Sequence, residues 1–387
     1  MANEEEELRQ QAVVLHSQGV KVTEIARRIG RSRQWVHTWI NRHAEGSEHW
    51  SKSRSKAPHH TANKLSQTME NLVVESRLRL EAAPYMESGA YAIWHDLSSR
   101  GVTPPSVATI NRILRAHGLS RKKVPYQKSG LEYPEIPQST HLMDLVGPRY
   151  IRGGSRFYLL TIISNDTRHA GVYPMLSKRA VDITRGVTSF WKAYTIPDFL
   201  QLDNELSFKG SNRHPRGLGL LMRTAMQLNV IPRFIPVGEP WRNGVIERFN
   251  QKVERTLLIQ PHRDFDDLLC HAREFMETHN SSHHYSPFGQ KTPDQLDYEL
   301  GIPMVPLNHD YEVDERPRLD SDNMNEIHFI RLVRSDLTIN VLNTEIRVNP
   351  MLMHTYVMAQ LLVNDHLLLI KQDGKTVQTV EFPMPVI

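Results

Sequence analysis

The stretch PVGEPWRNGVIERFN, residues 236–250, sets the frame for the rest of the chain. Its first half holds the prolines and glycines that are typical of a loop. From Ile246 onward, apolar residues recur at helical spacing through Phe249 and Val253, which predicts a helix. Glu247 lies about one turn into this helix and off its apolar face. Acids in a first helical turn are often simply solvated and favoured by the helix dipole, so Glu247 alone assigns no function.

Two upstream stretches favour a functional interpretation of Glu247. Residues 140–146 form an apolar run with one acid inside it, Asp144, and residues 198–204 form a shorter run that ends at Asp203. An aspartate in or at the end of a buried strand costs free energy unless it is paired or binds a metal. Three convergent carboxylates can hold two divalent cations on either side of a phosphate.

Asp144, Asp203 and Glu247 resemble the Asp-Asp-Glu set of retroviral-type integrases and of the related bacterial insertion-sequence transposases. The resemblance covers about residues 138–302 directly. Other stretches that carry it are Asp203-Asn204 with Phe208 after it, Phe234-Ile235-Pro236, residues 243–250, and the segment from His279-Asn280 to Thr292-Pro293. It implies a ribonuclease-H-like catalytic core in which the three acids are the catalytic residues and bind two Mg²⁺ or Mn²⁺ ions.

The chain departs from the family pattern in three places. Glu205 stands where relatives often have glycine, and Glu254 stands where they often have lysine. The spacing from Asp203 to Glu247 is 43 intervening residues, longer than in retroviral integrases, because of an insertion near 210–219. The nearby basic residues, Lys252 and Arg255, are the expected DNA contacts on the carboxylate helix.

Length and composition narrow the class of protein. The chain has 387 residues, enough for two to four domains, and a mildly basic pI of about 9.0. Residues 1–130 hold 20 Lys and Arg against 12 Asp and Glu, whereas the remainder holds 27 against 31. The basic N-terminal third is therefore expected to bind a polyanion.

Cysteine content and hydropathy exclude other classes. A single cysteine, Cys270, excludes a disulfide framework and fits a reducing cytoplasm. The paired His and Cys spacing of the zinc-binding N-terminal domain of retroviral integrases is absent. The acidic start does not resemble a signal peptide, and the sequence has no apolar run long enough for a membrane span.

Residues 1–44 predict three short helices with a turn at Gly30-Arg31-Ser32, where Ser32 caps the third helix. The pattern resembles a helix-turn-helix of the resolvase and transposase kind, whose third helix reads the major groove. The alternative is an ordinary three-helix bundle with a solvated basic face. The expected DNA contacts at the third helix are Arg31, Arg33, Gln34, His37, Thr38 and Arg42.

Two linkers and a second helical region follow. Residues 45–64 predict a flexible basic linker that lies along phosphates through Lys52, Arg54 and Lys56. Residues 65–123 predict a second helix-turn-helix-like domain, with a purely structural helical spacer as the alternative. Residues 124–137 contain three prolines and predict another linker. The expected DNA contacts of the second domain are Arg112, Arg115, Arg121, Lys122 and Lys123.

Residues 138–302 are expected to form the catalytic core. The predicted order is three strands, a helix, the strand before Asp203, a helix, a strand and the Glu247 helix. Periodicity alone indicates an α/β fold, and the family resemblance selects the ribonuclease-H-like one. Asp166 is expected in a loop between two strands. His279, His283 and His284 fit no zinc motif and are interpreted as surface residues near DNA or in solvent.

The last third of the sequence changes character. Residues 303–324 are rich in Pro and Asp and predict a linker. Residues 325–387 predict six short strands separated by turn pairs such as Asp373-Gly374. This pattern is similar to the small SH3-like β-barrel that closes integrases, where it contacts DNA or another subunit.

The sequence is thus interpreted as a multidomain α/β DNA transposase or integrase, a metal-dependent polynucleotidyl transferase that cleaves transposon ends and joins them to target DNA. The alternatives are an inactive DNA-binding regulator and a nuclease that only hydrolyses. Double-stranded DNA, a homo-oligomer on that DNA and a helper ATPase are the expected partners. The expected location is the bacterial cytoplasm, at the nucleoid.

Overall fold

A computed structural model describes residues 2–46, 48–53, 65–120, 132–151, 153–210, 215–301, 303–320, 322–323 and 325–385. The chain divides into two compact units, residues 1–66 and residues 67–387. Within the described ranges, every helix is too short or too polar to span a bilayer.

The first unit contains three helices, α1 (Ala2–Ser17), α2 (Val22–Ile29) and α3 (Arg33–Ala44). Gly30 ends α2 at a φ of 69°, a left-handed conformation that glycine adopts without strain. Ser32 caps α3 by accepting a hydrogen bond of 3.1 Å from the Trp35 amide. The three helices share a core of Ala12, Ile25, Ala26, Ile29 and Val36. These features confirm the predicted helix-turn-helix.

The second unit begins with three more helices, α4 (Gln67–Ala82), α5 (Ala90–Ser99) and α6 (Val107–Ala116). Val73, Ile93, Leu97 and Ile110 are fully buried and form their shared interior. The connection between α4 and α5 packs against the rest of the unit, since the Tyr85 ring meets Phe275 edge to face at 5.9 Å.

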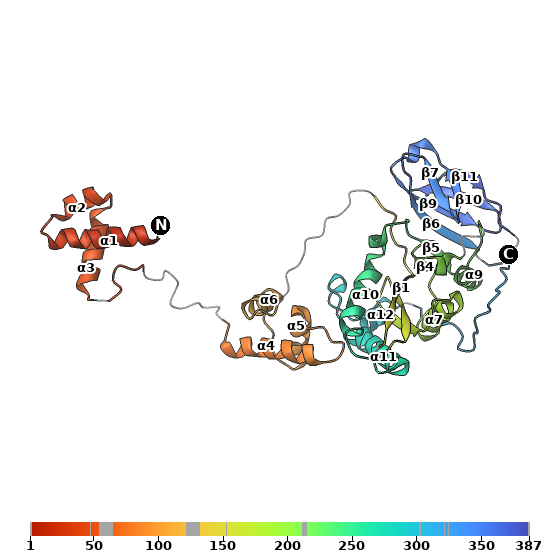
Figure 1. The fold of residues 1–387 in the computed structure, drawn as a ribbon, viewed down its shortest axis with the longest axis horizontal. Helices are drawn as coiled ribbons and strands as arrows, with labels where there is room; N and C mark the ends of the chain where they lie inside the picture. The colour runs from red at the N-terminus through yellow and green to blue at the C-terminus, as the bar shows by residue number, and fades with distance from the viewer. Residues whose placement is uncertain are drawn as a thin grey trace. The chain divides into compact units, whose positions relative to one another are not determined.

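A nine-stranded sheet forms the centre of the second unit, in the order β11-β10-β9-β6-β5-β4-β1-β2-β3 (Figure 1). The sheet contains β1 (Thr140–Tyr150), β2 (Arg156–Ser164), β3 (Ala170–Met175), β4 (Phe199–Leu202), β5 (Ile231–Phe234), β6 (Glu326–Leu332), β9 (Tyr356–Leu362), β10 (Leu367–Gln372) and β11 (Lys375–Glu381). Two further strands, β7 (Thr338–Val341) and β8 (Thr344–Arg347), pair with each other outside it. The helical elements are α7 (Ala180–Ala193), α8 (Leu206–Lys209), α9 (Leu220–Gln227), η1 (Pro240–Asn243), α10 (Gly244–Thr256), α11 (Phe265–Ser282), η2 (Ser286–Phe288), α12 (Pro293–Leu300) and η3 (Pro350–Leu352).

Alternation along β1 sorts its side chains to two layers of helices. Met143 packs in one cluster with residues of α7 and α9, and Leu142 and Val146 pack in a second cluster with residues of α10 and α11. Asp144 lies between Leu142 and Val146 at the same parity, so it faces α10. Strands β1, β2 and β3 are antiparallel, and β4 and β5 run parallel to β1. This is the order of the ribonuclease-H-like fold that the sequence predicted.

The C-terminal region is rich in antiparallel strands, as expected, with β6, β9, β10 and β11 paired in turn and β7 and β8 forming a separate ribbon. It does not stand apart as its own sheet. β5 pairs in parallel with β6 through Arg233 opposite His328 and Phe234 opposite Phe329, and these two phenylalanine rings stack at 5.2 Å. The physical reason is that β5 is buried and its free edge needs a hydrogen-bonding partner.

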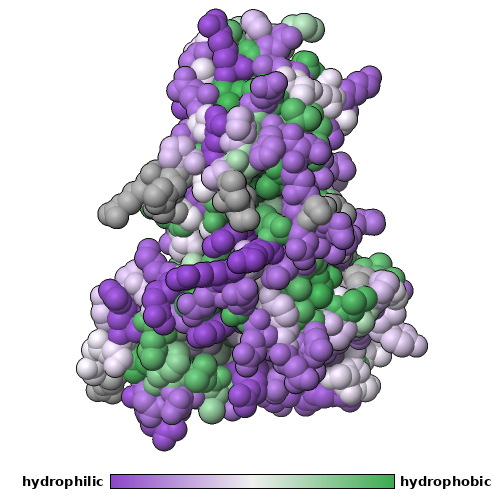
Figure 2. Space-filling model, turned by 90° about the vertical axis from the view of Figure 1, so that its right-hand side faces the viewer, coloured by the Kyte–Doolittle hydropathy of each residue, from purple (hydrophilic) through white to green (hydrophobic). Residues whose placement is uncertain are grey.

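Hydrophilic side chains dominate the face drawn in Figure 2, and the apolar ones lie between them in small groups. Surfaces of this kind are usual for proteins that keep a solvated exterior. Three exposed apolar side chains, Leu206, Val237 and Trp241, lie within ten residues of Asp203 or Glu247 in the sequence.

Candidate active site

The positions of Asp144 and Asp203 follow from the pairing of β1 with β4. The two strands are in parallel register from Thr140 opposite Phe199 to Leu142 opposite Gln201, and β4 ends one residue later. Asp144 and Asp203 each lie two residues beyond that last pair. Neighbouring strands are about 4.8 Å apart, so the two aspartates lie at equivalent places on the same face.

Asn243 holds the start of α10 over the point where the two strands separate. Its side-chain oxygen accepts a hydrogen bond of 3.1 Å from the Gln201 amide, and its own amide donates to the Met143 carbonyl at 3.4 Å. Asn243 and Gln201 are both buried. The asparagine therefore ties the start of α10 to both strands, through Gln201 of β4 and Met143 of β1.

Helix α10 brings Glu247 and Asn250 to the same face, three residues apart. The Asn250 side-chain amide donates a hydrogen bond of 2.7 Å to one Asp144 carboxylate oxygen, and the Leu145 backbone amide donates one of 2.8 Å to the other. The side-chain oxygen of Asn250 is buried and has no hydrogen-bond partner. One carboxylate is thus oriented by the helix, and an oxygen acceptor nearby remains available.

The acids of the site repel one another. Burial, together with the charges of Asp144 and Glu205, raises the pKa of Asp203 to about 6, against the opposing effect of a hydrogen bond from the Glu205 backbone amide. Burial also raises the pKa of Asp144, with Glu205 and Glu247 adding to the shift. Among the described residues, no Lys, Arg or His forms an ion pair with Asp144, Asp203 or Glu247. The ligand oxygens of these three do not all lie within 4.8 Å of one another.

Glu205 and Asp166 lie in different surroundings. The Glu205 carboxylate is 3.2 Å from the Lys178 amine, and the Glu205 amide donates to Asp203 at 2.9 Å. Glu205 is therefore a fourth acid close to the predicted set. Asp166 lies in the loop between β2 and β3, as expected, where it accepts a hydrogen bond of 2.7 Å from the Ser139 amide.

The C-terminal region supports the turn that carries Asp203. Arg331 of β6 is buried and donates a hydrogen bond of 3.0 Å to the Asn204 side-chain oxygen and one of 3.1 Å to the Ile235 carbonyl. The Asn204 amide donates to the same Ile235 carbonyl at 2.6 Å. Desolvation lowers the pKa of Arg331 to about 10. The residue after Asp203 is thus held by Arg331 of β6 and by Ile235, the residue that follows β5.

A second contact ties the start of α10 to β9. The Arg242 guanidinium contacts the rings of both Tyr133 and Tyr356, at 4.1 and 4.7 Å from their centroids, and the two rings meet edge to face at 5.1 Å. It donates to Glu239 at 3.1 Å and to the Tyr356 hydroxyl at 2.9 Å, and that hydroxyl donates to Glu239 at 2.6 Å. We call Tyr133, Glu239, Arg242 and Tyr356 the arginine clamp.

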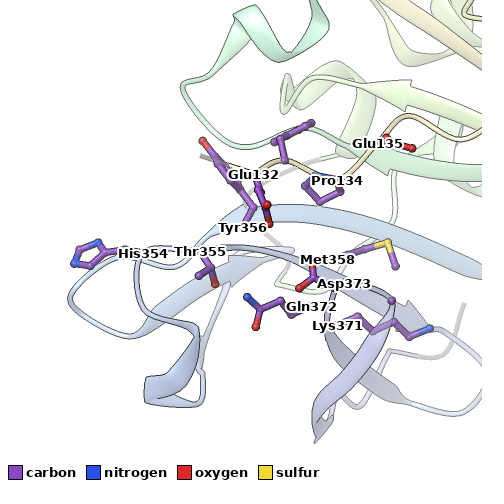
Figure 3. Close-up of a pocket in the computed structure, with 12 residues that line it drawn as sticks. Glu132, Pro134, Glu135, His354, Thr355, Tyr356, Met358, Lys371, Gln372 and Asp373 are labelled. Carbon is purple, nitrogen blue, oxygen red and sulfur yellow. The ribbon is translucent and has the colours of Figure 1, made fainter. Parts of the chain in front are cut away.

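A cavity of about 750 Å³ lies beside the arginine clamp, between the segment before β1 and strands β9 and β10. Tyr356 and Met358 project into it from β9, and Pro134 and Glu135 border it from the other side (Figure 3). The clamp therefore joins the segment that leads into β1, the loop before Glu247 and the C-terminal region.

The expected DNA contacts divide into several groups. Arg31, Arg33, Gln34, His37 and Thr38 are exposed at the start and outer face of α3, although Arg31 also pairs with Glu5. Arg42 is half-buried, with its guanidinium 4.8 Å from the Trp39 ring. Exposed positions also hold Lys52, Arg112, Arg115 and Arg255. The remaining expected contacts, Arg54, Lys56, Arg121, Lys122 and Lys123, lie outside the described residues.

Lys252 does not occupy the solvent-facing position that was expected of it. Its side chain is 11% exposed, and its amine lies 3.0 Å from His279 Nδ1 and 4.0 Å from Glu87. Burial lowers the pKa of Lys252 to about 8. Lys252 follows Phe249 by three residues, so the helix turns its side chain toward His279 of α11.

The three histidines near the end of α11 are also not solvated as expected. His279 is buried and accepts or donates at both ring nitrogens, to Lys252 and to the Tyr285 hydroxyl. His283 is paired with Glu87 at 3.2 Å, and His284 stacks on His95 at 3.6 Å. They pack the α4–α5 connection against α11, which is a structural role.

Sequence reasoning did not find the residues that orient the acids. Asn243 and Asn250 stood inside the quoted motif without a role, although buried amides beside an acid were the signal available. The contacts of Arg242 with Tyr356 and of Arg331 with Asn204 and Ile235 gave no signal, because these partners lie about 90 to 130 residues away in the chain.

A ribonuclease-H-like sheet with two aspartates on neighbouring parallel strands, below a helix that carries a glutamate, defines an integrase-type core. Residues 228–293 match the integrase core domain family, and residues 3–50 match the homeodomain-like domain family. The second unit thus contains a stretch similar to integrase core domains, and the first unit is similar to homeodomain-like domains, in agreement with its helix-turn-helix.

Solved retroviral structures resemble the chain at low sequence identity. The HTLV-2 integrase catalytic core domain, in complex with magnesium, is 14% identical with a TM-score of 0.33, and the match covers 42% of this chain and 97% of that chain. A simian T-cell lymphotropic virus intasome chain is 13% identical with a TM-score of 0.38, covering 76% and 93%. The BIV integrase catalytic core domain is 12% identical with a TM-score of 0.33, covering 43% and 97%.

Asp203→Asn is expected to stabilise the protein at pH 7. The folded protein keeps the Asp203 proton up to about pH 6, whereas an unfolded chain loses it near 3.8, so wild-type stability falls as the pH rises through that window. The substitution should raise the free energy of unfolding by about 2 kcal/mol at pH 7 and by much less at pH 4. Thermal melts at pH 7 and pH 4 measure this difference in stability.

Asp182→Asn should instead destabilise the protein at pH 7, because hydrogen bonds from Ser177 and Arg179 lower the pKa of Asp182.

Arg242→Met should destabilise the second unit. The substitution leaves the Glu239 carboxylate, which is 11% exposed, without its cation, and it removes both ring contacts. We expect a loss of about 2 to 4 kcal/mol in urea unfolding. Arg179→Met is the matched control, since its pair with Asp182 is 74% exposed on the arginine side and should cost under about 1 kcal/mol. Equal losses from both variants would show that the clamp adds nothing beyond a surface pair.

Proposed function

We propose that the protein is a DNA transposase or integrase that cleaves transposon ends and joins their 3′-hydroxyls to target DNA. The observation that supports this most directly is the placement of Asp144 and Asp203 two residues beyond the last registered pair of β1 and β4, under the helix that carries Glu247. Two raised aspartate pKa values in one uncompensated acidic site are typical of a site built for another positive charge.

The residues fit hard divalent cations. Carboxylate oxygens from three elements are the ligands that Mg²⁺ and Mn²⁺ prefer, and the unpartnered Asn250 oxygen adds a neutral acceptor. Asp144, Asp203 and Glu247 would hold two ions, which would supply Lewis acidity to a scissile phosphate and lower the pKa of a bound water.

The chain's own contribution is to fix these oxygens in place. Asn250 and the Leu145 amide orient the two Asp144 oxygens, and Asn243 sets the start of α10 and thereby the position of Glu247. In the first reaction a water oxygen bonds to phosphorus and the bond to the 3′ oxygen breaks. In the second, the freed 3′-hydroxyl bonds to a target phosphorus and one target strand breaks. Positioning is the main requirement for such in-line transfers.

End recognition is assigned to α3. Its exposed outer face presents Arg33, Gln34, His37 and Thr38, which are side chains able to reach base edges in a major groove. Because a transposition reaction joins two ends, we propose a homo-oligomer on DNA, with a helper ATPase as a further partner. The residue boundaries proposed for the domains are those given from the sequence.

Two alternatives remain distinct in their products. An inactive regulator would bind ends without cutting them, and a nuclease would cut without joining. An assay with paired-end DNA, target DNA and Mg²⁺ separates the three: joined product supports the proposal, cleavage alone supports the nuclease, and binding alone supports the regulator.

Asp144→Asn, Asp203→Asn and Glu247→Gln should each reduce strand transfer to background and leave end binding nearly unchanged. Each substitution removes one negative charge from the cation site, and α3 belongs to a different compact unit. Gel-based joining and binding assays with Mg²⁺ measure both quantities. Asp166→Asn is the control and should keep transfer, because Asp166 contacts the Ser139 amide instead of the site. We expect a weaker loss for Glu205→Gln. Near-normal transfer by any of the first three variants would remove that residue from the site.

Gln34→Ala and His37→Ala should reduce the preference for transposon ends over random DNA. Lys52→Ala should instead weaken binding to both DNAs equally and reduce its salt dependence, since phosphate contacts carry no sequence preference. Competition binding at two salt concentrations measures the difference, with residues 67–387 as a fragment that lacks α3. If that fragment prefers the ends as strongly as the full chain does, then recognition lies outside α3.

A further inference from the structure

A cluster of metal-ligating side chains lies at the junction of α10 and α11, separate from the three catalytic acids. It consists of His262, in the connection between the helices, and of Asp267 and His271, one turn apart on α11. One ligand atom from each residue lies within 4.8 Å of the others. We propose that this cluster binds a divalent transition-metal ion, with Zn²⁺ as the best match.

The hydrogen bonds of His262 prepare it as a ligand. Its Nε2 lies 3.1 Å from the Leu257 carbonyl, an acceptor only, so Nε2 carries the proton and Nδ1 presents a lone pair. That is the arrangement of most metal-bound histidines, whose second nitrogen donates to a carbonyl or carboxylate. His262 is buried, so the direction of this lone pair is fixed by its surroundings.

His262 Nδ1 points at the equivalent nitrogen of His271, 2.9 Å away. An imidazole hydrogen bond explains that distance only if His271 places its own proton on Nδ1. A metal ion between the two would separate the nitrogens to about 3.3 Å, given tetrahedral bonds of about 2.0 Å. The side chain of His271 is half-buried, so it can make this small movement.

Asp267 supplies the third ligand, and Arg263 orients it. The Arg263 amide donates to one Asp267 oxygen at 2.9 Å, and the guanidinium donates to the other at 2.8 and 3.2 Å. An ionised carboxylate has about four acceptor sites, so three such bonds leave one free. The side chain of Asp267 is 10% exposed while that of Arg263 is 84% exposed, which places the carboxylate inward and its partner outward.

The set of ligands selects the class of ion. Two imidazoles and one carboxylate suit Zn²⁺ and its neighbours, whereas Mg²⁺ prefers oxygen ligands throughout. Three protein ligands leave a fourth position for water. His262 also lines a surface pocket of about 350 Å³ together with Gln260 and Pro261, which gives solvent a path to the cluster.

A second histidine-acid group in the described residues does not share this character. His169 Nδ1 pairs with Asp297 at 2.9 Å, and Asn280 donates to His169 Nε2 at 3.2 Å. Asp297 also accepts a hydrogen bond of 2.5 Å from the Tyr194 hydroxyl. The ring nitrogens of His169 thus bond to a carboxylate and to a side-chain amide, and neither faces a second imidazole as Nδ1 of His262 does. The contrast singles out the His262 cluster.

The test is a titration of the full-length, metal-free chain with Co²⁺, in excess Mg²⁺ so that the acidic site is saturated. Four-coordinate Co²⁺ absorbs visible light far more strongly than six-coordinate Co²⁺ does. We expect one four-coordinate Co²⁺ per chain, displaced by Zn²⁺, and a higher melting temperature on binding. The readout needs no DNA, so it stands or falls separately from the proposed transposase activity.

His271→Ala and Asp267→Asn should each weaken Co²⁺ binding on the order of 100-fold. Cys270→Ser is the matched control, because Cys270 is exposed, adjoins His271 and also binds Co²⁺ in other settings, yet it is not one of the proposed ligands. It should leave the spectrum unchanged. If His271→Ala does not fold, as judged by circular dichroism, Asp267→Asn decides the matter alone. Absent binding, a six-coordinate spectrum, binding that survives the ligand substitutions, or loss of the signal in Cys270→Ser would each overturn the proposal.

Discussion

The separation of two parallel strands is the constraint on which the site depends. β1 and β4 pair over three residues and then part. Beside that point the Asn243 side chain donates a hydrogen bond to the Met143 carbonyl and so brings the start of α10 to the opening. A buried backbone carbonyl that lacks a hydrogen bond costs about as much as any single contact in a core. One backbone group therefore determines where the helix begins, and the helix determines where its glutamate lies.

The C-terminal strands complete this arrangement from the other side. Arg331 reaches from β6 to the residue after Asp203, and Tyr356 reaches from β9 to Arg242, next to Asn243. Both arginines are largely shielded from water, where charged hydrogen bonds are strong and an unpaired charge is costly. The region that resembles an appended domain in sequence is thus part of the frame that holds two of the three acids.

The sequence predicted what local pattern determines. Strand and helix periodicity, the Ser32 cap and the acids inside apolar runs depend on neighbours in the chain, and each was found in the expected place. It did not predict contacts made at long range, such as Arg331 with Asn204, or the joining of β5 to β6 across a Pro-rich and Asp-rich segment. Lys252 shows the limit most clearly: its charge indicated a DNA contact, while its place on the helix turned it toward His279.

The joined sheet also has a consequence for synthesis on the ribosome. β5 ends at Phe234, and its partner β6 begins roughly 90 residues later, at Glu326. At about 5 to 20 residues per second, an emerging chain would carry β5 as an unpaired edge for roughly 5 to 18 s. Unpaired edges of apolar strands are the sites at which nascent chains aggregate. The chain therefore has a period, before its last strands appear, in which contact between copies would be premature.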